Sequence, residues 1–265
     1  MNILKRELKA NLKVFIFWII GLFVLLFAGM TKFSGMGQVA GGADVNAVMS
    51  KFPKVVLAVF GMVGVDVASL PGYYAILAYY VLICAVIYGI QLGVNAAVKE
   101  INDKTYEFIF TKPCSRSYVL GIKIAASWFN LILFIIFEFV FSLLAVAFLD
   151  TGEQINQVIF LYAVSILLVS SLFFSLAVFL SIVIKEVEKG MLYTNLIFLS
   201  AFVMAIVYDM LENGRVIKVI TPFKYFEAKD LVKSRLDGWY VLVCMALSMV
   251  LLTESFVKFK KKDLK

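Results

Sequence analysis

The sequence predicts an all-α membrane protein with six transmembrane helices. Of its 265 residues, 63% are hydrophobic and only 16% are charged, whereas a soluble domain carries roughly 25% charged residues. Its mean hydropathy is +0.96. Apolar surface on this scale needs a lipid bilayer as its partner. The net charge of +7 does not indicate nucleic acid, because Lys and Arg gather at the ends of the apolar runs, where membrane topology and lipid headgroups account for them.

Six apolar runs are long enough to be spans, since crossing a hydrocarbon core ~30 Å thick takes ~20 helical residues. They cover residues 14–30, 72–98, 118–149, 158–184, 191–208 and 239–256. We expect one transmembrane domain over residues 1–265. All four prolines fall outside these runs, which predicts unbroken helices. The first run is too long for the apolar core of a cleavable signal peptide, so we expect it to be retained as the first span.

Two further helices are expected at the membrane surface. Residues 2–12 place Leu4, Leu8 and Leu12 on one helical face and most basic side chains on the other, a pattern typical of an interfacial amphipathic helix. A plain basic flank that sets topology is the alternative. Residues 53–60 are apolar but too short to cross the core, and Pro53 suits a first helical turn. This segment is expected to be an outer interfacial or re-entrant helix.

The distribution of positive charge predicts the topology. With six spans, both termini lie on one side. The N-terminal flank, residues 99–123, residues 185–189 and the C-terminal tail together hold sixteen Lys and Arg, and the opposite side holds nine. The positive-inside rule therefore predicts that both termini and residues 99–123 are cytoplasmic. The loop at 209–237, with six basic residues, fits this topology least well.

The sequence contains none of the common catalytic motifs considered below. The chain has no histidine, and it lacks the G-x-x-x-x-G-K-[ST], H-E-x-x-H and G-x-S-x-G patterns. It is therefore not expected to be an enzyme by itself, to bind ATP, or to hold a metal or cofactor. Unbroken spans without inverted repeats also argue against an ion-coupled secondary carrier. Energy for any transport must then come from another chain.

Glu138 is the clearest ionisable residue inside a span, and it is flanked by phenylalanines. A carboxylate there is costly in lipid, so it should face the bundle interior, a partner subunit or a cavity. Asn130 lies two turns earlier on nearly the same face. We interpret this pair as a possible substrate path or dimer seam, with a structural interhelical hydrogen bond as the equal alternative.

Residues 99–123 form a charged interruption between two very apolar runs. Residues 102–110 can form about two and a half helical turns that end before Pro113. Ile101, Thr105 and Phe108 share one face, as in a helix that docks in a groove, and Ser115 or Ser117 can cap the helix that follows. Movement of this segment would pass into the third span. A solvated loop is the plainer alternative.

The chain as a whole resembles the permease subunit of ABC-2 type ABC transporters. The resemblance rests on the amphipathic N-terminus, six spans, the outer segments FPKVVLAVFG and TPFKYF, and one cytoplasmic pattern. That pattern comprises Glu100, Lys104, Thr105, Tyr106, Glu107, Phe108, Pro113, Ser115, Arg116, Val119, Gly121 and Lys123. The family pattern has a small residue where Lys104 stands.

The resemblance implies a multi-pass exporter subunit in a bacterial cell membrane. Glu100, Lys104, Thr105, Tyr106, Glu107, Phe108 and Arg116 would form the coupling element that docks on a separate ATP-binding subunit. ATP and Mg would be bound by that partner. A second permease copy or close paralogue and two ATPases would complete the assembly. Relatives of this layout suggest an amphipathic peptide, an antibiotic or a lipid-like molecule as cargo. A stand-alone carrier or channel, and a membrane scaffold or lipid-modifying enzyme, are the alternatives.

Overall fold

The fold is an antiparallel bundle of long helices. The computed structural model describes residues 3–39, 45–102, 115–149, 152, 154–184, 186–211 and 215–261, and its regular structure there is entirely helical. The long helices are α1 (Ile3–Val39), α4 (Leu70–Asn102), α6 (Arg116–Ala147), α7 (Asn156–Val183), α8 (Val187–Met210) and α11 (Gly238–Lys261). All six are long and apolar enough to cross a membrane, which confirms the predicted fold class.

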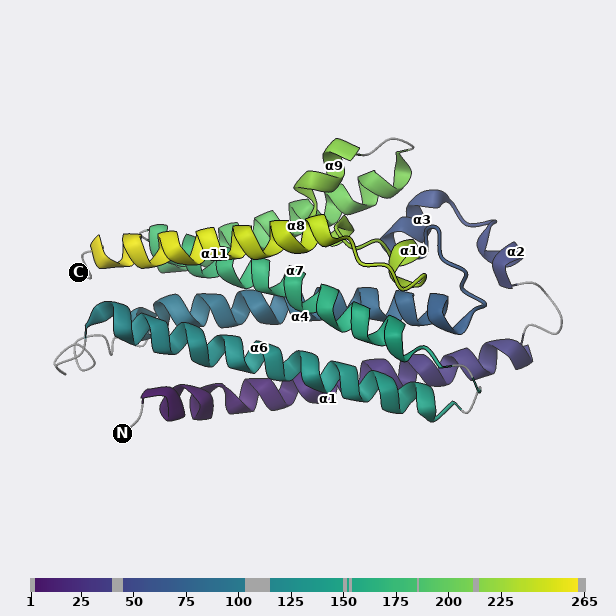
Figure 1. The fold of residues 1–265 in the computed structure, drawn as a ribbon, viewed down its shortest axis with the longest axis horizontal. Coiled ribbons are helices and arrows are strands. Elements are labelled where there is room, and N and C mark those ends of the chain that lie inside the picture. Colours follow the sequence, from purple (N-terminus) through teal and green to yellow (C-terminus); the bar gives the residue numbers. More distant parts are fainter. Residues whose placement is uncertain are drawn as a thin grey trace.

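The two ends of the bundle differ (Figure 1). One end, here called the terminal end, holds the start of α1, the end of α11 and the helix ends that flank residues 103–114. The other, the cap end, carries the short helices α2 (Val45–Met49), α3 (Lys54–Val59), α9 (Arg215–Ile220), η1 (Pro222–Lys224) and α10 (Ala228–Leu231). The long loop at 209–237 therefore lies at the same end as residues 45–69, as the sequence-based topology required.

The N-terminal segment differs from the expectation. Residues 3–12 are helical, but they are the first turns of the 37-residue helix α1 and not a separate element. No glycine or proline precedes Gly21, so nothing interrupts the helical hydrogen bonds there. Leu4 and Leu12 are exposed, whereas Glu7 and Asn11 face the bundle. The leucine face is thus turned outward, where it can contact lipid.

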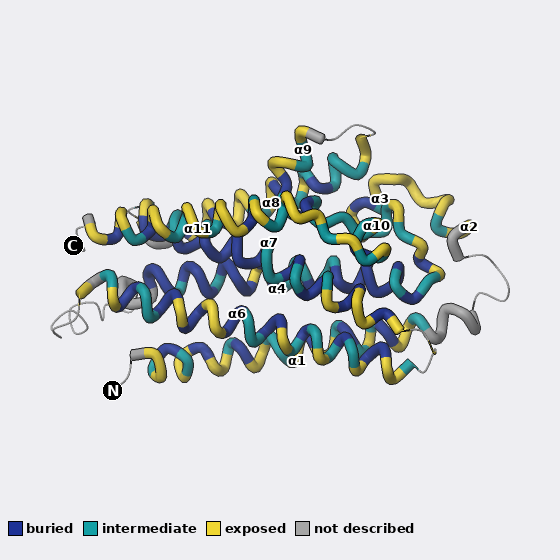
Figure 2. Tube along the Cα trace, viewed as in Figure 1, coloured by how far each residue is buried: buried dark blue, intermediate teal, exposed yellow. Residues whose placement is uncertain are grey.

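The helices α4 and α7 form the centre of the bundle, and α8 and α11 lie at its surface (Figure 2). Gly89 and Gly93, four residues apart on α4, lie against α7. A Cβ atom on Gly93 would lie 2.6 Å from the carbonyl oxygen of Phe174 and 2.8 Å from the Cβ of Ala177. Small residues at this spacing let transmembrane backbones approach closely. The contact between α4 and α7 therefore depends on glycine.

We expect Gly93→Leu to destabilise the bundle. The new side chain meets the backbone of α7, which cannot rotate away, and such overpacking costs about 1–3 kcal/mol. Gly21→Leu is the matched control, because an added Cβ there meets nothing within 4 Å and the gain in helix propensity is the same. Thermal unfolding in detergent measures both variants. Equal melting temperatures for the two would show that α4 and α7 are not closely packed.

Candidate functional site

Glu138 lies in the interior of the bundle, where it joins α4 to α6. Its Oε1 atom accepts hydrogen bonds from the Tyr74 hydroxyl at 3.0 Å and the Ser142 hydroxyl at 3.1 Å. The two hydroxyls are themselves 3.1 Å apart. All three residues have 0% exposure. Three oxygens thus form a closed triangle, the intramembrane triad, which is shielded from lipid within a single chain.

Tyr162 on α7 completes the surroundings of the triad. Its ring packs edge-on against Tyr74, with the ring centroids 5.6 Å apart. Within the described part of the chain, neither the Tyr162 hydroxyl nor the Oε2 atom of Glu138 has a hydrogen-bond partner, and both are buried. Buried polar atoms of this kind are rare and call for an explanation.

Asn130 is buried on the same helix but does not share the bonds of the triad. Its Nδ2 atom donates to the carbonyl oxygen of Ala126 at 3.1 Å, within α6. Eight residues separate Asn130 from Glu138, which is about 12 Å along a helix. The structure therefore does not bring these two predicted site residues together.

The predicted coupling element lies largely outside the described residues. Lys104, Thr105, Tyr106, Glu107 and Phe108 all fall in residues 103–114. Glu100 lies near the end of α4 and Arg116 opens α6, and nothing is described of either side chain.

The helices that flank this element are well defined. Ser115 is the N-cap of α6, as predicted, and its Oγ atom accepts a hydrogen bond from the backbone N–H of Tyr118. The preceding helix, α4, reaches Asn102, four residues beyond the expected span. Residues 103–114 therefore connect the central helix directly to the helix that carries Glu138.

The outer segment TPFKYF forms the core of a cap, defined here as residues 221–231. Phe223 is buried among Phe173 of α7 and Phe198 and Phe202 of α8, with ring centroids 5.6 to 6.1 Å away. Tyr225 stacks on Tyr240 of α11 at 4.6 Å. Aromatic contacts thus attach the cap to three transmembrane helices.

Ion pairs attach the polar side of the cap. Lys224 pairs with Asp209 of α8. Glu227 pairs with Lys218 and Lys229, and it also accepts a hydrogen bond from the Tyr208 hydroxyl. Burial alone would raise the pKa of Glu227, but the hydrogen bonds from these partners and the charge of Lys218 outweigh it and hold the pKa below its usual range.

The low pKa of Glu227 predicts loss of stability in acid. A carboxylate with a lowered folded-state pKa contributes stability above its ordinary value of about 4.3, and the contribution is lost as the pH falls through the lowered pKa. Glu227→Gln should cost about 1.5–3 kcal/mol at neutral pH, as for a hydrogen-bonded charge, and the difference from wild type should vanish in acid. Melting temperature as a function of pH tests this. Glu186→Gln is the control, because its pair with Lys189 is solvent-exposed. A difference in melting temperature between wild type and Glu227→Gln that persists unchanged in acid would contradict this prediction.

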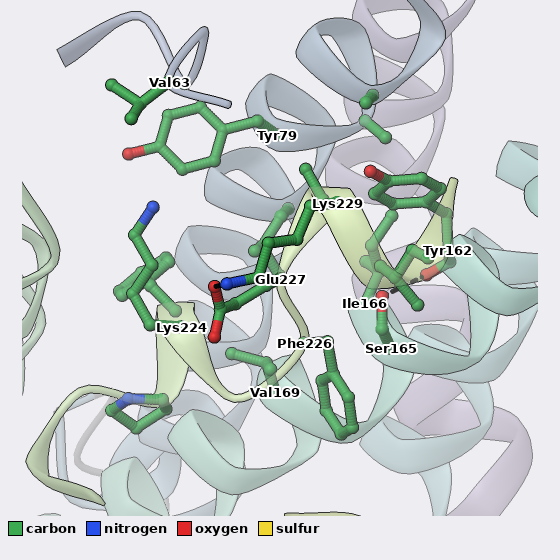
Figure 3. Close-up of a pocket in the computed structure, with 18 of the residues that line it drawn as sticks. Val63, Tyr79, Tyr162, Ser165, Ile166, Val169, Lys224, Phe226, Glu227 and Lys229 are labelled. Atoms are coloured by element: carbon green, nitrogen blue, oxygen red, sulfur yellow. Dashed lines mark hydrogen bonds and ion pairs between the residues drawn. The ribbon is translucent and has the colours of Figure 1, made fainter. Parts of the chain in front are cut away.

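The cap and the helices beneath it enclose a pocket of about 70 Å³ (Figure 3). Lys224, Glu227 and Lys229 line it from the cap, and Tyr162 and Ser165 line it from α7. A water molecule occupies about 30 Å³ in the liquid, so the pocket suits a few water molecules and not a peptide or lipid.

Sequence reasoning missed the partners of Glu138 and the whole charged network of the cap. Ser142 could have been found, because it lies at i+4 on the same helical face as Glu138. Tyr74 could not, since it is 64 residues away in the sequence. Among the residues that the structure describes, no three Cys, Asp or Glu side chains gather as metal ligands would.

A family model described as "ABC-2 family transporter protein" matches residues 1–264. Among curated proteins, none matches the chain.

Proposed function

The chain belongs to the ABC-2 transporter family, and from that premise we propose that it is the transmembrane subunit of an ATP-driven exporter. Membership makes it a permease component of an ABC transporter in a membrane, with an ABC ATPase as its partner. The observation that carries the proposal is the family match along the chain, supported by six helices able to span a bilayer. ATP and Mg would be bound and used by the ATPase, and the permease would form the path for the cargo.

We place the contact with the ATPase at residues 100–116. Glu100, Lys104, Thr105, Tyr106, Glu107, Phe108 and Arg116 are the proposed contact residues. The position of the flanking helices supports this, because α4 is one of the two central helices of the bundle and the intramembrane triad joins α4 to α6. Movement imposed on the segment between them would act on both helices.

The terminal end is proposed to face the cytoplasm of a bacterial cell. The segments at this end, including both termini, carry sixteen of the 25 Lys and Arg residues. Such an excess is typical of cytoplasmic loops, and an ATPase fuelled by cytoplasmic ATP must bind there.

The proposed assembly contains a second permease chain, either an identical copy or a close paralogue. The pocket under the cap holds only about 70 Å³, far less than the 300–1,000 Å³ typical of a site for a drug-sized ligand. The pocket under the cap is therefore too small for cargo, and we propose that a path for an amphipathic peptide, an antibiotic or a lipid-like molecule forms between two chains. The outer helices α1, α8 and α11, which leave large apolar side chains exposed, are the surfaces available for that contact.

Co-purification and transport test the proposal together. The chain, tagged and co-expressed with a Walker-motif ATPase from a neighbouring reading frame, should retain that ATPase through purification. Inside-out vesicles with both subunits should accumulate cargo only with hydrolysable ATP. Vesicles with an ATPase that lacks its Walker lysine are the control. Cargo movement by the permease alone, driven by an ion gradient, would overturn the proposal.

A further inference from the structure

We propose that Tyr74, Glu138 and Ser142 form a proton-binding site in which Glu138 carries the proton, and that the pocket under the cap supplies this proton past Tyr162. The site joins α4 to α6, and Tyr162 of α7 packs against Tyr74. It goes beyond the proposed transport function, because nothing in that function requires proton binding.

The number of hydrogens in the triad supports the bound proton. Its three oxygens make three contacts of 3.0 to 3.1 Å. A hydroxyl has one hydrogen, so Tyr74 and Ser142 together supply two. An ionised Glu138 would therefore leave one contact without a hydrogen. A proton on its Oε1 atom supplies the third, and each of the three oxygens then donates once and accepts once.

The surroundings of Glu138 agree with a neutral acid. Within the described chain, no Lys or Arg forms an ion pair with Glu138, and its polar contacts are with two neutral hydroxyls. An unpaired carboxylate charge in an apolar interior is very costly.

The titratable group that contacts Glu138 is Tyr74 of α4, and Tyr162 of α7 packs in turn against Tyr74. On α6 itself the neighbour is Ser142. From α1, Phe15 packs on Phe137 and Phe23 packs on Phe141, two aromatic residues close to Glu138 along α6. Nothing charged among these groups would hold an ionised Glu138.

Tyr162 provides the connection to the cap end. It lines the pocket, whose opposite wall carries Lys224, Glu227 and Lys229 (Figure 3), and its ring packs on Tyr74. Its hydroxyl and the Oε2 atom of Glu138 are both buried without a hydrogen-bond partner in the described residues. A free phenol and a free carboxyl oxygen are the groups through which water in the pocket would exchange protons with the triad.

The proposal predicts that acid from the cap end controls the packing of α4 against α6. Loss of the proton leaves a charge without a cation and breaks the hydrogen-bond cycle of the triad. The contact between the two helices that flank residues 103–114 would weaken at the same time.

Infrared difference spectroscopy on the permease–ATPase complex in lipid nanodiscs tests the proton-binding site. The measurement needs neither ATP nor cargo. Wild type should show the carbonyl stretch of a protonated carboxylic acid, which Glu138→Gln should lose. Tyr74→Phe keeps the carboxyl group but removes one of its two hydrogen bonds, so the band should remain and shift. Identical spectra for wild type and both variants would overturn the proton site, even if transport were intact.

The route is tested by the rate at which this band responds to transfer into deuterated water. Tyr162→Phe should slow the exchange. Tyr88→Phe is the matched control. It also removes a buried tyrosine hydroxyl without a hydrogen-bond partner in the described residues, but Tyr88 lies on α4 and does not line the pocket. Equal exchange rates in the two variants would overturn the route from the cap end.

Discussion

Reversing the charge of Glu107, as in Glu107→Lys, is expected to abolish ATP-driven transport while the permease still inserts in the membrane. A carboxylate in a docked interface is paired with a donor or cation of the partner, and removing one member of such a pair costs about 2–5 kcal/mol. At 1.4 kcal/mol for each factor of ten, charge reversal should weaken ATPase binding by at least about thirtyfold. Phe108→Ala should act in the same direction by removing an apolar anchor from the same segment.

Two quantities are measured for each variant: the amount of ATPase that co-purifies with the permease, and the accumulation of cargo in vesicles. Lys233→Glu is the control, because it reverses an exposed charge two residues after α10, and α10 lies at the other end of the bundle from the helix ends that flank residues 103–114. It should bind and transport as wild type does. If Glu107→Lys and Phe108→Ala both retained wild-type complex formation and transport, the coupling element would lie elsewhere in the chain.

The spans could be predicted because hydropathy measures directly what the bilayer selects. Their observed ends depart by a few residues, since helical hydrogen bonds continue past the hydrocarbon edge. The helix α4 reaches Asn102 where the apolar run ends at Val98, and α8 begins at Val187, four residues before its apolar run. The largest departure is α1, where an amphipathic segment and a span join in one helix. Amphipathicity predicts which face of a helix is apolar, but it does not predict whether the chain bends between an amphipathic segment and the span that follows it.

Contacts between helices were harder to predict. Gln91 of α4 accepts a hydrogen bond from Trp18 of α1, a partner that could not be identified from spacing. The same holds for Glu138 and Tyr74. In a membrane protein most helix faces are apolar, so hydropathy does not say which face meets which neighbour. Asn130 and Glu138 were paired because they lie on nearly the same face, yet Asn130 bonds within its own helix.

The cap shows a different limit of sequence reasoning. From the sequence, residues 209–237 are predicted to be a polar loop, because their many charges obscure three aromatic residues that pack inward, Phe223, Tyr225 and Phe226. In TPFKYF, Lys224 lies between Phe223 and Tyr225, so its cation and the two rings lie on different sides of a short helical turn. Only the structure shows that the cations meet Asp209 and Glu227 while Phe223 enters the bundle. A polar composition therefore concealed a packed element.

Phe223→Ala is expected to detach the cap from α7 and α8. The ring contacts three other phenylalanines and is 4% exposed, and truncating a buried Phe to Ala typically costs about 3–5 kcal/mol. Only the ion pairs of Lys224 and Glu227 would then attach the polar side of the cap. Each pair would be weaker, because it would be more exposed to solvent. Phe223→Leu keeps most of the volume and should cost less than about 1.5 kcal/mol.

The reactivity of the Cys244 thiol measures whether the cap has detached. Its thiol is buried with Tyr225 of the cap and Leu172 of α7, so cap release should expose it. In a chain that also carries Cys84→Ser and Cys114→Ser, Phe223→Ala should make Cys244 react faster with a water-soluble maleimide, and Phe223→Leu should not. Val216→Ala, on an exposed residue of α9, should leave the rate unchanged. If Phe223→Ala lowered the melting temperature while Cys244 stayed protected, the cap would be held by its ion pairs and the aromatic cluster would stabilise α7 and α8 alone.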